Sequence, residues 1–385
     1  MADSKRFAIF SAQFLPNVGG VEKYTDNLAR ELARQGHEVV VATTDAAAPS
    51  GIEKVAPGVE VVRLPCFPLI GGRMPMPRKN GEFKRLWGEL CSRSYDGVLV
   101  NTRFYLHSLL GLKLAERQGL RAVVCEHGSA YLTFGNALLD KAVVAYEHAI
   151  TARVKHYRPD FYAVSSKGLE WLSTFGIQGR GVLSNAIDAD AFRASSSGRS
   201  FRSSFGIKDE TLLVSFVGRF IPEKGVDALL EAMRIIDGKG VDAMLVMAGT
   251  GPLEDRIRSA NLGTVAVAGK LSAPDVAALL EESDLFCLPT RSEGFSTSLL
   301  EAAACGTPSL ITDVGGVAEM IPDETYGTVL LDARPETIAA AIEAAANDRG
   351  RLAKQGALSF ERVRALYSWE CTACAVADAC QDANR

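Results

Sequence analysis

A regular alternation of short apolar runs with stretches of helical periodicity constrains the fold more than any other feature of the chain. The runs are rich in β-branched residues, and the stretches between them, such as 22–34 and 226–236, carry apolar residues at three- and four-residue spacing. This alternation predicts parallel sheets covered by helices. The predicted strands are 7–12, 38–43, 59–64, 97–101, 122–125 and 161–164 in the first half, and 212–217, 243–248, 265–268, 285–288, 309–312 and 328–331 in the second.

The alternation starts twice with similar sequences. FAIFSAQFLPNVGGVEKYTDNLAREL, from residue 7, and LLVSFVGRFIPEKGVDALLEAMRII, from residue 212, each combine a strand, a Phe-x-Pro loop, a Gly-Val-acid turn and a helix. A helix N-terminus has unpaired N–H groups and partial positive charge, so each copy is a candidate phosphate site. Neither loop has the G-x-G-x-x-G pattern, and any doubly wound domain begins this way. The repeat therefore supports the fold more firmly than the function.

The length of 385 residues fits two domains better than one. Residues 194–202, rich in Ser, Gly and Arg, have no apolar period and are predicted to be the linker. We therefore predict domains over residues 1–193 and 203–365, followed by a C-terminal segment over residues 366–385.

Charge and hydropathy limit the partners and the compartment. No apolar run reaches the ~18 residues of a membrane span, and residues 6–15 are read as a first strand rather than a signal peptide. The expected compartment is the cytoplasm. Residues 1–195 hold 24 Lys and Arg against 19 Asp and Glu, whereas residues 196–385 hold 18 against 27. This asymmetry predicts that only the first half approaches an anionic partner, and nothing indicates nucleic-acid binding.

The segment PTRSEGFSTSLLE, residues 289–301, is the strongest chemical signal. We predict a helix beginning near Gly294, with Glu293 at its start. Glu301 would lie roughly 12 Å further along, about the span from the sugar to the ribose of a nucleotide-sugar. A carboxylate among apolar residues is costly to bury unpaired, although acids at helix starts are common without any function. The backbone N–H groups expected to bind phosphate or sugar oxygens are those of Gly294, Phe295 and Ser296.

Arg219 and Lys224 follow the first predicted strand of the second half. Arg grips phosphate with two parallel hydrogen bonds and Lys acts as a point charge, so the pair could stabilise a departing diphosphate without a metal. The alternative is that both are solvated surface cations. His127 follows strand 122–125, at the sheet edge where ligands gather. It is predicted to contact a sugar, with a core histidine as the alternative.

Together these motifs resemble the retaining glycosyltransferases of family 4, over nearly the whole chain. Glu293 and Glu301 match the family's signature glutamates, and Arg219 and Lys224 match its diphosphate-binding cations. The segment Glu126-His127-Gly128 matches the one whose histidine reaches the donor sugar. Further matches are the glycine loop with Gly19 and Gly20, Gly218 in loop 217–225, loop 248–252, Lys270 near the base, run 302–319, the crossing at 184–188 and the helix motif at 368–370.

The resemblance implies the GT-B fold: two Rossmann-like doubly wound domains facing across a cleft, with a C-terminal helix returning to the first domain. The first domain would bind the acceptor and the second the nucleotide-sugar. The implied reaction transfers a sugar from a UDP- or GDP-sugar to an acceptor hydroxyl with retention, in cell-surface polysaccharide or glycolipid synthesis. The nucleotide-sugar is a co-substrate, and neither a cofactor nor a metal is expected. Ala186 and Ser296 depart from the family's usual residues, so no relative's donor preference is carried over.

Two short motifs are interpreted as structural rather than metal-binding. Asp188-Ala-Asp190 matches the D-x-D pattern by which another glycosyltransferase fold binds a divalent metal, but such matches are frequent by chance. Cys371-Thr-Ala-Cys374 has no second cysteine or histidine pair, and we expect it on a buried helix face.

Other function classes remain open. A sugar-nucleotide epimerase or a phosphorylase can share this architecture, because fold alone does not settle reaction type. A phosphorylase would need a cofactor lysine and a longer chain. A non-catalytic sugar-nucleotide- or glycan-binding protein would not need both glutamates together with Arg219 and Lys224. A nicotinamide dehydrogenase is disfavoured because no glycine fingerprint is followed by a ribose-binding acid.

Residues 82–90 suggest a membrane contact. Phe83, Leu86, Trp87 and Leu90 fall on one helical face, and five basic residues lie around them: Arg73, Arg78, Lys79, Lys84 and Arg85. Such a helix can bind an anionic membrane peripherally, which predicts a lipid-linked acceptor glycan at the inner membrane face. The alternative is an ordinary helix packed on its own sheet, with a soluble acceptor.

Overall fold

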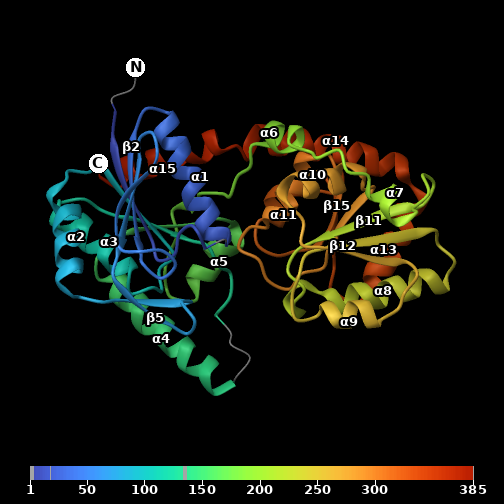
Figure 1. The fold of residues 1–385 in the computed structure, drawn as a ribbon, viewed down its shortest axis with the longest axis horizontal. Coiled ribbons are helices and arrows are strands. Elements are labelled where there is room, and N and C mark those ends of the chain that lie inside the picture. The colour runs from blue at the N-terminus through green and yellow to red at the C-terminus, as the bar shows by residue number, and fades with distance from the viewer. Residues whose placement is uncertain (1–3, 18, 133–136, 385) are drawn as a thin grey trace. The chain divides into compact units, whose positions relative to one another are not determined.

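The chain forms two α/β units (Figure 1), as seen in a computed structural model that describes residues 4–17, 19–132 and 137–384. The first unit comprises Met1–Asn185 and Trp369–Arg385, and the second comprises Ala186–Ser368. Each unit is a sheet with helices packed on it, so the predicted doubly wound α/β architecture is confirmed.

The first unit is built on a sheet with the strand order β10-β9-β8-β7-β1-β2-β4-β3. Its strands pair in parallel except for the edge strand β3, which runs antiparallel to β4. The central strands are buried on both faces, as parallel sheets require. The strands are β1 (Arg6–Ser11), β2 (Glu38–Thr44), β3 (Gly51–Ala56), β4 (Val59–Leu64), β7 (Gly97–Asn101), β8 (Val123–Glu126), β9 (Asp160–Ala163) and β10 (Gly181–Val182); β5 (Cys66–Leu69) and β6 (Met74–Pro77) form a separate antiparallel hairpin.

Helices cover this sheet, and one of them comes from the C-terminus. The helix α15 (Trp369–Asp382) packs on α1 (Gly20–Arg34), where the Tyr24 and Trp369 rings meet edge to face at 5.6 Å. The prediction likewise placed the C-terminal helix with the first half. The remaining helices are α2 (Gly81–Ser92), α3 (Ser108–Arg117), α4 (Ala137–Lys155) and α5 (Ser166–Ser173).

The second unit has a fully parallel sheet in the order β13-β12-β11-β14-β15-β16, the arrangement of a dinucleotide-binding fold. Its strands are β11 (Leu212–Val217), β12 (Ala243–Ala248), β13 (Val265–Gly269), β14 (Leu285–Leu288), β15 (Ser309–Thr312) and β16 (Thr328–Leu330). Its helices are α6 (Ala189–Ala194), α7 (Phe201–Phe205), the 3₁₀ turn η1 (Pro222–Lys224), α8 (Val226–Gly238), α9 (Glu254–Ser259), α10 (Ala273–Glu282), α11 (Thr297–Ala304), α12 (Val317–Met320), α13 (Pro335–Asn347) and α14 (Arg349–Leu366).

The boundary between the units differs from the predicted one. It lies between Asn185 and Ala186, so the predicted linker 194–202 belongs to the second unit. The reason is Phe201, whose ring is fully buried there and whose N–H donates to a Glu282 carboxylate oxygen at 2.6 Å. A segment with little apolar periodicity can still be anchored by one aromatic side chain.

Every predicted strand forms, and several, such as Val59–Leu64 and Ala243–Ala248, have the predicted bounds. The prediction missed β3, β10 and the β5–β6 hairpin. The hairpin was hidden because its strands contain prolines, which are depleted in strands.

The helix proposed to contact a membrane packs on its own sheet. Phe83, Leu86 and Leu90 of α2 are buried in the core of the first unit, and Trp87 packs partly against it. The prediction that this apolar face meets a lipid surface is therefore wrong. Among the described residues, no helix combines the length and hydropathy needed to cross a bilayer.

Candidate active site

Each sheet reverses its strand order at one place, between β1 and β7 in the first unit and between β11 and β14 in the second. Ligands of open parallel sheets bind outside the carboxyl ends of the strands at such switch points. The predicted site residues follow these ends: His127 follows β8, Arg219 and Lys224 follow β11, and Glu293 follows β14.

In the second unit, two glycines let the loops at this edge pack closely. Gly225 has a φ of +72°, and a Cβ on it would lie 2.1 Å from the Pro289 carbonyl oxygen. Gly249 has a φ of +146°, and a Cβ there would lie 1.8 Å from the Gly218 carbonyl oxygen. Only glycine is compatible with both the conformation and the approach. The loops after β11, β12 and β14 therefore form one surface.

A pocket of about 280 Å³ opens on this surface. Arg219 and Lys270 line it with exposed side chains, and none of the described lining residues is acidic. The half of the chain that holds this pocket is acidic overall, so the positive lining is a local feature. The remaining lining residues are Val217, Gly218, Ala248, Gly249, Thr250, Leu271 and Val276. The pocket is suited to an anionic ligand.

The loops on either side of the switch point are joined by an ion pair between Lys224 and Glu293. Both side chains are largely buried, at 17% and 13% exposed. The Arg291 N–H also donates to the Glu223 carbonyl oxygen at 2.8 Å, which ties the same loops together. The sequence predicted Lys224 and Glu293 as separate contacts to phosphate and sugar; in the structure they contact each other.

The helix that carries Glu301 begins later than predicted. It starts at Thr297 rather than near Gly294, because the Ser296 side chain is its N-cap and accepts from the Leu299 N–H at 3.3 Å. The Ser296 hydroxyl is thus used within the protein. Within the described ranges, no hydrogen-bond acceptor faces the N–H groups of Gly294 and Phe295, while the buried Phe295 ring packs 5.6 Å from Tyr367. Glu301 lies one turn inside α11.

The glycine loop of the first unit leads directly into α1. The helix starts at Gly20 with Gly19 as its N-cap, and the Lys23 N–H donates to the Gly19 carbonyl at 3.1 Å. A Cβ at Gly19 would lie 2.3 Å from a Glu22 carboxylate oxygen. Burial raises the pKa of Glu22. Val18, in the same loop, lies outside the described residues.

His127 lies at the carboxyl edge of the first sheet and is partly buried. Its Nε2 is 3.0 Å from Asn101 Oδ1 at the end of β7, and its ring meets the Tyr24 ring edge to face at 4.7 Å. Burial lowers the pKa of His127 to about 3, so the imidazole is neutral. Asn101 was missed from the sequence, although a polar residue at the end of an apolar strand was a usable signal.

A buried ionic cluster holds the backbone around His127. Arg103 pairs with Glu126 and, at 3.0 Å, with Glu147, and all three side chains are almost fully buried. The other Glu126 oxygen accepts from the N–H groups of His127 and Gly128 at 3.1 Å each. Burial raises the pKa of Glu147. No sequence pattern could have paired Arg103 with Glu147, because local periodicity carries no information about partners so distant in the chain.

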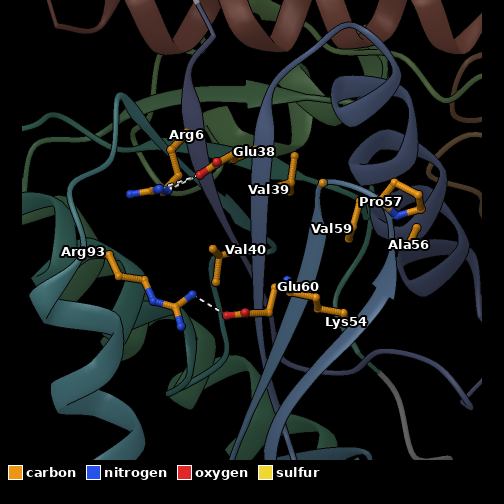
Figure 2. Close-up of a pocket in the computed structure, with 11 residues that line it drawn as sticks. Arg6, Glu38, Val39, Val40, Lys54, Ala56, Pro57, Val59, Glu60 and Arg93 are labelled. Carbon is orange, nitrogen blue, oxygen red and sulfur yellow. Dashed lines mark hydrogen bonds and ion pairs between the residues drawn. The ribbon is translucent and has the colours of Figure 1, made fainter.

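A larger pocket of about 450 Å³ lies at the opposite edge of the first sheet (Figure 2). It opens where β1, β2 and β4 begin. Figure 2 shows its charged side chains directed at one another: Arg6 pairs with Glu38 at 2.5 Å, and Arg93 pairs with Glu60. The pocket therefore lies at the amino ends of the strands, away from the predicted site residues, and its charges largely satisfy each other.

The two motifs considered for metal binding are a helix cap with a neighbouring ion pair, and a pair of exposed cysteines. The Asp188 side chain caps α6 by accepting from the Ala191 N–H at 3.0 Å, and Asp190 pairs with Arg364 at 2.9 Å. Cys371 and Cys374 are exposed, which contradicts the predicted buried face; α15 turns residues such as Thr372 and Val376 inward instead. The described residues contain no group of three or more His, Cys, Asp and Glu side chains that could hold a metal ion.

Two family descriptions match consecutive parts of the chain. "Glycosyltransferase Family 4" matches residues 18–191, and "Glycosyl transferases group 1" matches residues 198–358. The chain belongs to the family 4 glycosyltransferases. Its two Rossmann-like units are those of the GT-B fold.

Known proteins resemble this family 4 glycosyltransferase over nearly its whole length. A GDP-mannose-dependent alpha-(1-6)-phosphatidylinositol dimannoside mannosyltransferase of Mycobacterium tuberculosis is 28% identical, covering 95% of this chain and 96% of the relative. The sucrose-phosphate synthase of Thermosynechococcus elongatus superposes with a TM-score of 0.76 at 21% identity, over 97% of this chain and 98% of the other. Anabaena HepE in complex with UDP-glucose superposes with a TM-score of 0.68 at 16% identity, over 97% and 98%.

Proposed function

We propose that this glycosyltransferase moves a sugar from a nucleoside diphosphate sugar to an acceptor hydroxyl with retention of configuration, without a metal ion. The pocket with Arg219 and Lys270 carries the proposal, because exposed cations in a pocket whose described lining has no acidic residue suit a diphosphate. Lys224 and Glu293 lie beside the same loop. The curated relative is named for a GDP-mannose donor, and HepE was solved with UDP-glucose, so both donors are candidates.

The residues have distinct proposed roles. In the reaction, the bond between the anomeric carbon and the diphosphate oxygen breaks and a bond to the acceptor oxygen forms. The acceptor proton passes to the departing diphosphate. Arg219, Lys224 and the N–H groups of Gly294 and Phe295 stabilise the charge that develops there. Glu301 binds the ribose, Lys270 lies near the base, and His127 and the Gly19–Gly20 turn act on the same donor.

A transfer assay tests the proposal and separates it from its rivals. Purified protein is incubated with GDP-mannose or UDP-glucose and an acceptor extract, and nucleoside diphosphate release is measured. The anomeric configuration of the product is determined by NMR. We expect release that depends on the acceptor and an α-linked product from the α-linked donor. A new nucleotide-sugar formed without acceptor would instead show an epimerase, and binding without turnover would show a sugar-nucleotide-binding protein.

We further propose that the acceptor is lipid-linked and that the first unit contacts an anionic membrane through the β5–β6 hairpin. Phe67, Leu69 and Ile70 of this hairpin are 45–48% exposed. The Arg78 guanidinium lies 5.7 Å from the centre of the Phe67 ring, and Lys79 is exposed beside it. Apolar side chains flanked by basic ones suit the surface of an anionic bilayer, with about 1 kcal/mol for each nearby basic residue.

This hairpin lies at the same edge of the first sheet as the candidate residues of the first unit. It follows the carboxyl end of β4, the same sheet edge from which His127 and Asn101 project. The start of α4, which follows the carboxyl end of β8, adds the exposed Leu138 and Leu139. A lipid-linked acceptor held at this edge would have its glycan close to His127. The relative named for a phosphatidylinositol dimannoside is consistent with such an acceptor.

Co-sedimentation with vesicles tests this surface. We expect binding to phosphatidylglycerol vesicles at low salt, less binding at high salt, and little binding to phosphatidylcholine. Replacing Phe67, Leu69 and Ile70 together with serine should abolish binding. Leu331, 96% exposed in the second unit, is the matched control, and Leu331→Ser should bind like the wild type. No binding to anionic vesicles at low salt would favour a soluble acceptor.

A further inference from the structure

A chain of hydrogen bonds runs from the backbone of α1 to the ring of His127. The Thr25 hydroxyl donates to the Val21 carbonyl oxygen at 2.7 Å. Asn101 Nδ2 lies 2.8 Å from Thr25 Oγ1, and Asn101 Oδ1 lies 3.0 Å from His127 Nε2. Thr25 and Asn101 are both buried. These hydrogen bonds cross the switch point of the first sheet, from the helix after β1 to the ends of β7 and β8.

The donor and acceptor of each of these hydrogen bonds follow from the first one, between Thr25 and Val21. A backbone carbonyl can only accept, so the single Thr25 hydroxyl proton is committed to Val21. Thr25 Oγ1 must then accept from Asn101, which places the Asn101 amide nitrogen toward Thr25 and its oxygen toward His127. An amide oxygen can only accept, so His127 Nε2 must carry a proton. In a neutral imidazole the other nitrogen, Nδ1, is then an acceptor.

We propose that Thr25 and Asn101 are positioning residues that hold His127 as the Nε2–H tautomer, so that Nδ1 accepts a hydrogen bond from a hydroxyl of the donor sugar. Within the described part of the chain, Nδ1 has no hydrogen-bond partner. The contact to the sugar rests on the proposed function, whereas the tautomer does not. The site would therefore select a hydroxyl that can donate at this position.

The surroundings keep the ring neutral, as this role requires. The titratable groups nearest to it are Tyr24 on α1, whose ring contacts it, and Glu126, which precedes it on β8; Cys125 lies against Tyr24. Burial raises the pKa of both Tyr24 and Cys125, so both stay protonated. Glu126 is paired with Arg103 and also accepts from the His127 backbone N–H. A cationic ring would carry a proton on Nδ1 and could not accept.

Nitrogen NMR of histidine-labelled protein tests the tautomer directly, without a ligand. The protein has five histidines, and the ring nitrogen signals that are missing from the spectrum of His127→Gln are those of His127. We expect a pyrrole-like Nε2 and a pyridine-like Nδ1 in the wild type at pH 7. A pyrrole-like Nδ1, or an averaged pair of shifts, would overturn the proposal whether or not the protein transfers sugar.

Variants of Thr25 test the relay at a distance from the ring. Thr25→Val keeps the shape but removes the acceptor for Asn101. We expect the Asn101 amide to lose its fixed orientation and His127 to populate both tautomers, so that its two ring nitrogen shifts move toward each other. Thr25→Ser retains the hydroxyl and should restore the wild-type shifts. The matched control is Thr151→Val, the same change at a buried threonine of α4 outside the chain of bonds, and it should leave the tautomer unchanged. An unaltered tautomer in Thr25→Val would contradict the relay.

Kinetics connect the tautomer to the sugar. With whichever of GDP-mannose and UDP-glucose the wild type uses, we expect kcat/KM to fall about 3- to 10-fold in Thr25→Val, the size of one neutral hydrogen bond. It should recover in Thr25→Ser. A changed tautomer population with unchanged kcat/KM would show that Nδ1 does not contact the sugar. If the wild type has no transferase activity, the proposed function fails, but the NMR result still decides the tautomer.

Discussion

Different interactions connect the loops and helices on the two sides of the switch point in each sheet. In the first unit the bridge is a chain of neutral hydrogen bonds from Thr25 through Asn101 to His127. In the second unit it is the ion pair between Lys224 and Glu293, beside a pocket with two exposed cations. Neutral, buried bonds fix the orientation of a group, whereas exposed cations attract charge over a distance. The first unit therefore presents an oriented neutral group, and the second unit presents positive charge.

The largest expected effect comes from replacing Arg103, the buried cation of the first unit that holds the backbone around His127. Arg103→Leu leaves Glu126 and Glu147 buried without their partner, and we expect a loss of about 3–5 kcal/mol in the free energy of unfolding of the first unit. Denaturant unfolding followed by hydrogen exchange of β7 and β8 measures it. Arg180→Leu, which removes an exposed arginine from Asp160 while leaving the Asp160 pair with Arg121, should cost less than about 1 kcal/mol. Equal losses would mean that the buried cluster has no special role.

Removing Lys224 tests whether charge in the second unit drives the reaction. Lys224→Ala should lower kcat by about 10²- to 10³-fold, the effect of deleting one preorganised group that stabilises developing charge. Lys239→Ala is the matched control, because Lys239 also pairs with a glutamate, Glu343, in the same unit but away from the pocket. A change in KM alone would show that Lys224 binds the ground state rather than the transition state.

Acid should destabilise the first unit selectively, because the histidines whose pKa is lowered by burial, His37, His107 and His127, all lie in it. Burial lowers the pKa of His107 to about 4, well below the ordinary value near 6.5. As the pH falls below about 6.5, the unfolded chain takes up a proton that the folded unit does not. Stability is therefore lost between about pH 6.5 and pH 4, by about 1.6 kcal/mol for His107 between pH 6.5 and pH 5.

Hydrogen exchange at pH 7 and pH 5 measures this effect, with β1 and β2 reporting on the first unit and β11 and β12 on the second. His107→Gln should reduce the pH dependence of the first unit. A larger acid effect on the second unit would contradict the assignment.

A smaller effect separates the two glutamates of the second unit. Glu301→Gln should weaken nucleoside diphosphate binding about tenfold, because a bond to a charged carboxylate contributes roughly 1.5 kcal/mol in the ground and transition states alike. Glu293→Gln should lower turnover more than binding, because it disturbs Lys224. Calorimetric titration with GDP and UDP, together with kcat, distinguishes the two. Equal losses of affinity would show that the proposed division of roles is incorrect.

The smallest expected effect is that of a chelator. Because Arg219, Lys224 and Lys270 supply positive charge at the proposed phosphate site, activity should be unchanged in excess EDTA. The assay is repeated with added magnesium and manganese, and the denaturation midpoint serves as a control for chelator damage. Activity lost in EDTA and restored by either ion would show that the cations of the second unit are insufficient.

The places of the candidate residues in the fold could be predicted from the sequence, because these residues follow strands that form continuous apolar runs. Strands buried on both faces give continuous apolar runs, so the ends of β8, β11 and β14 were predicted closely, and with them His127, Arg219 and Glu293. The start of α11 was misplaced because the capping role of Ser296 is decided by the conformation of the preceding loop. The membrane surface was assigned to α2 because amphipathic periodicity does not distinguish a face buried on its own sheet from one that is exposed.

The sequence by itself determined the two doubly wound units, the positions of most strands and the loops that carry the candidate chemistry, because all of these depend on local periodicity and turn residues. Only the tertiary structure decided which side chains meet: Lys224 with Glu293, Arg103 with Glu126 and Glu147, and Thr25 with Asn101 and His127. These contacts depend on strand order. The order brings the ends of β7 and β8 beside the helix that follows β1, and no local pattern in the chain records that arrangement.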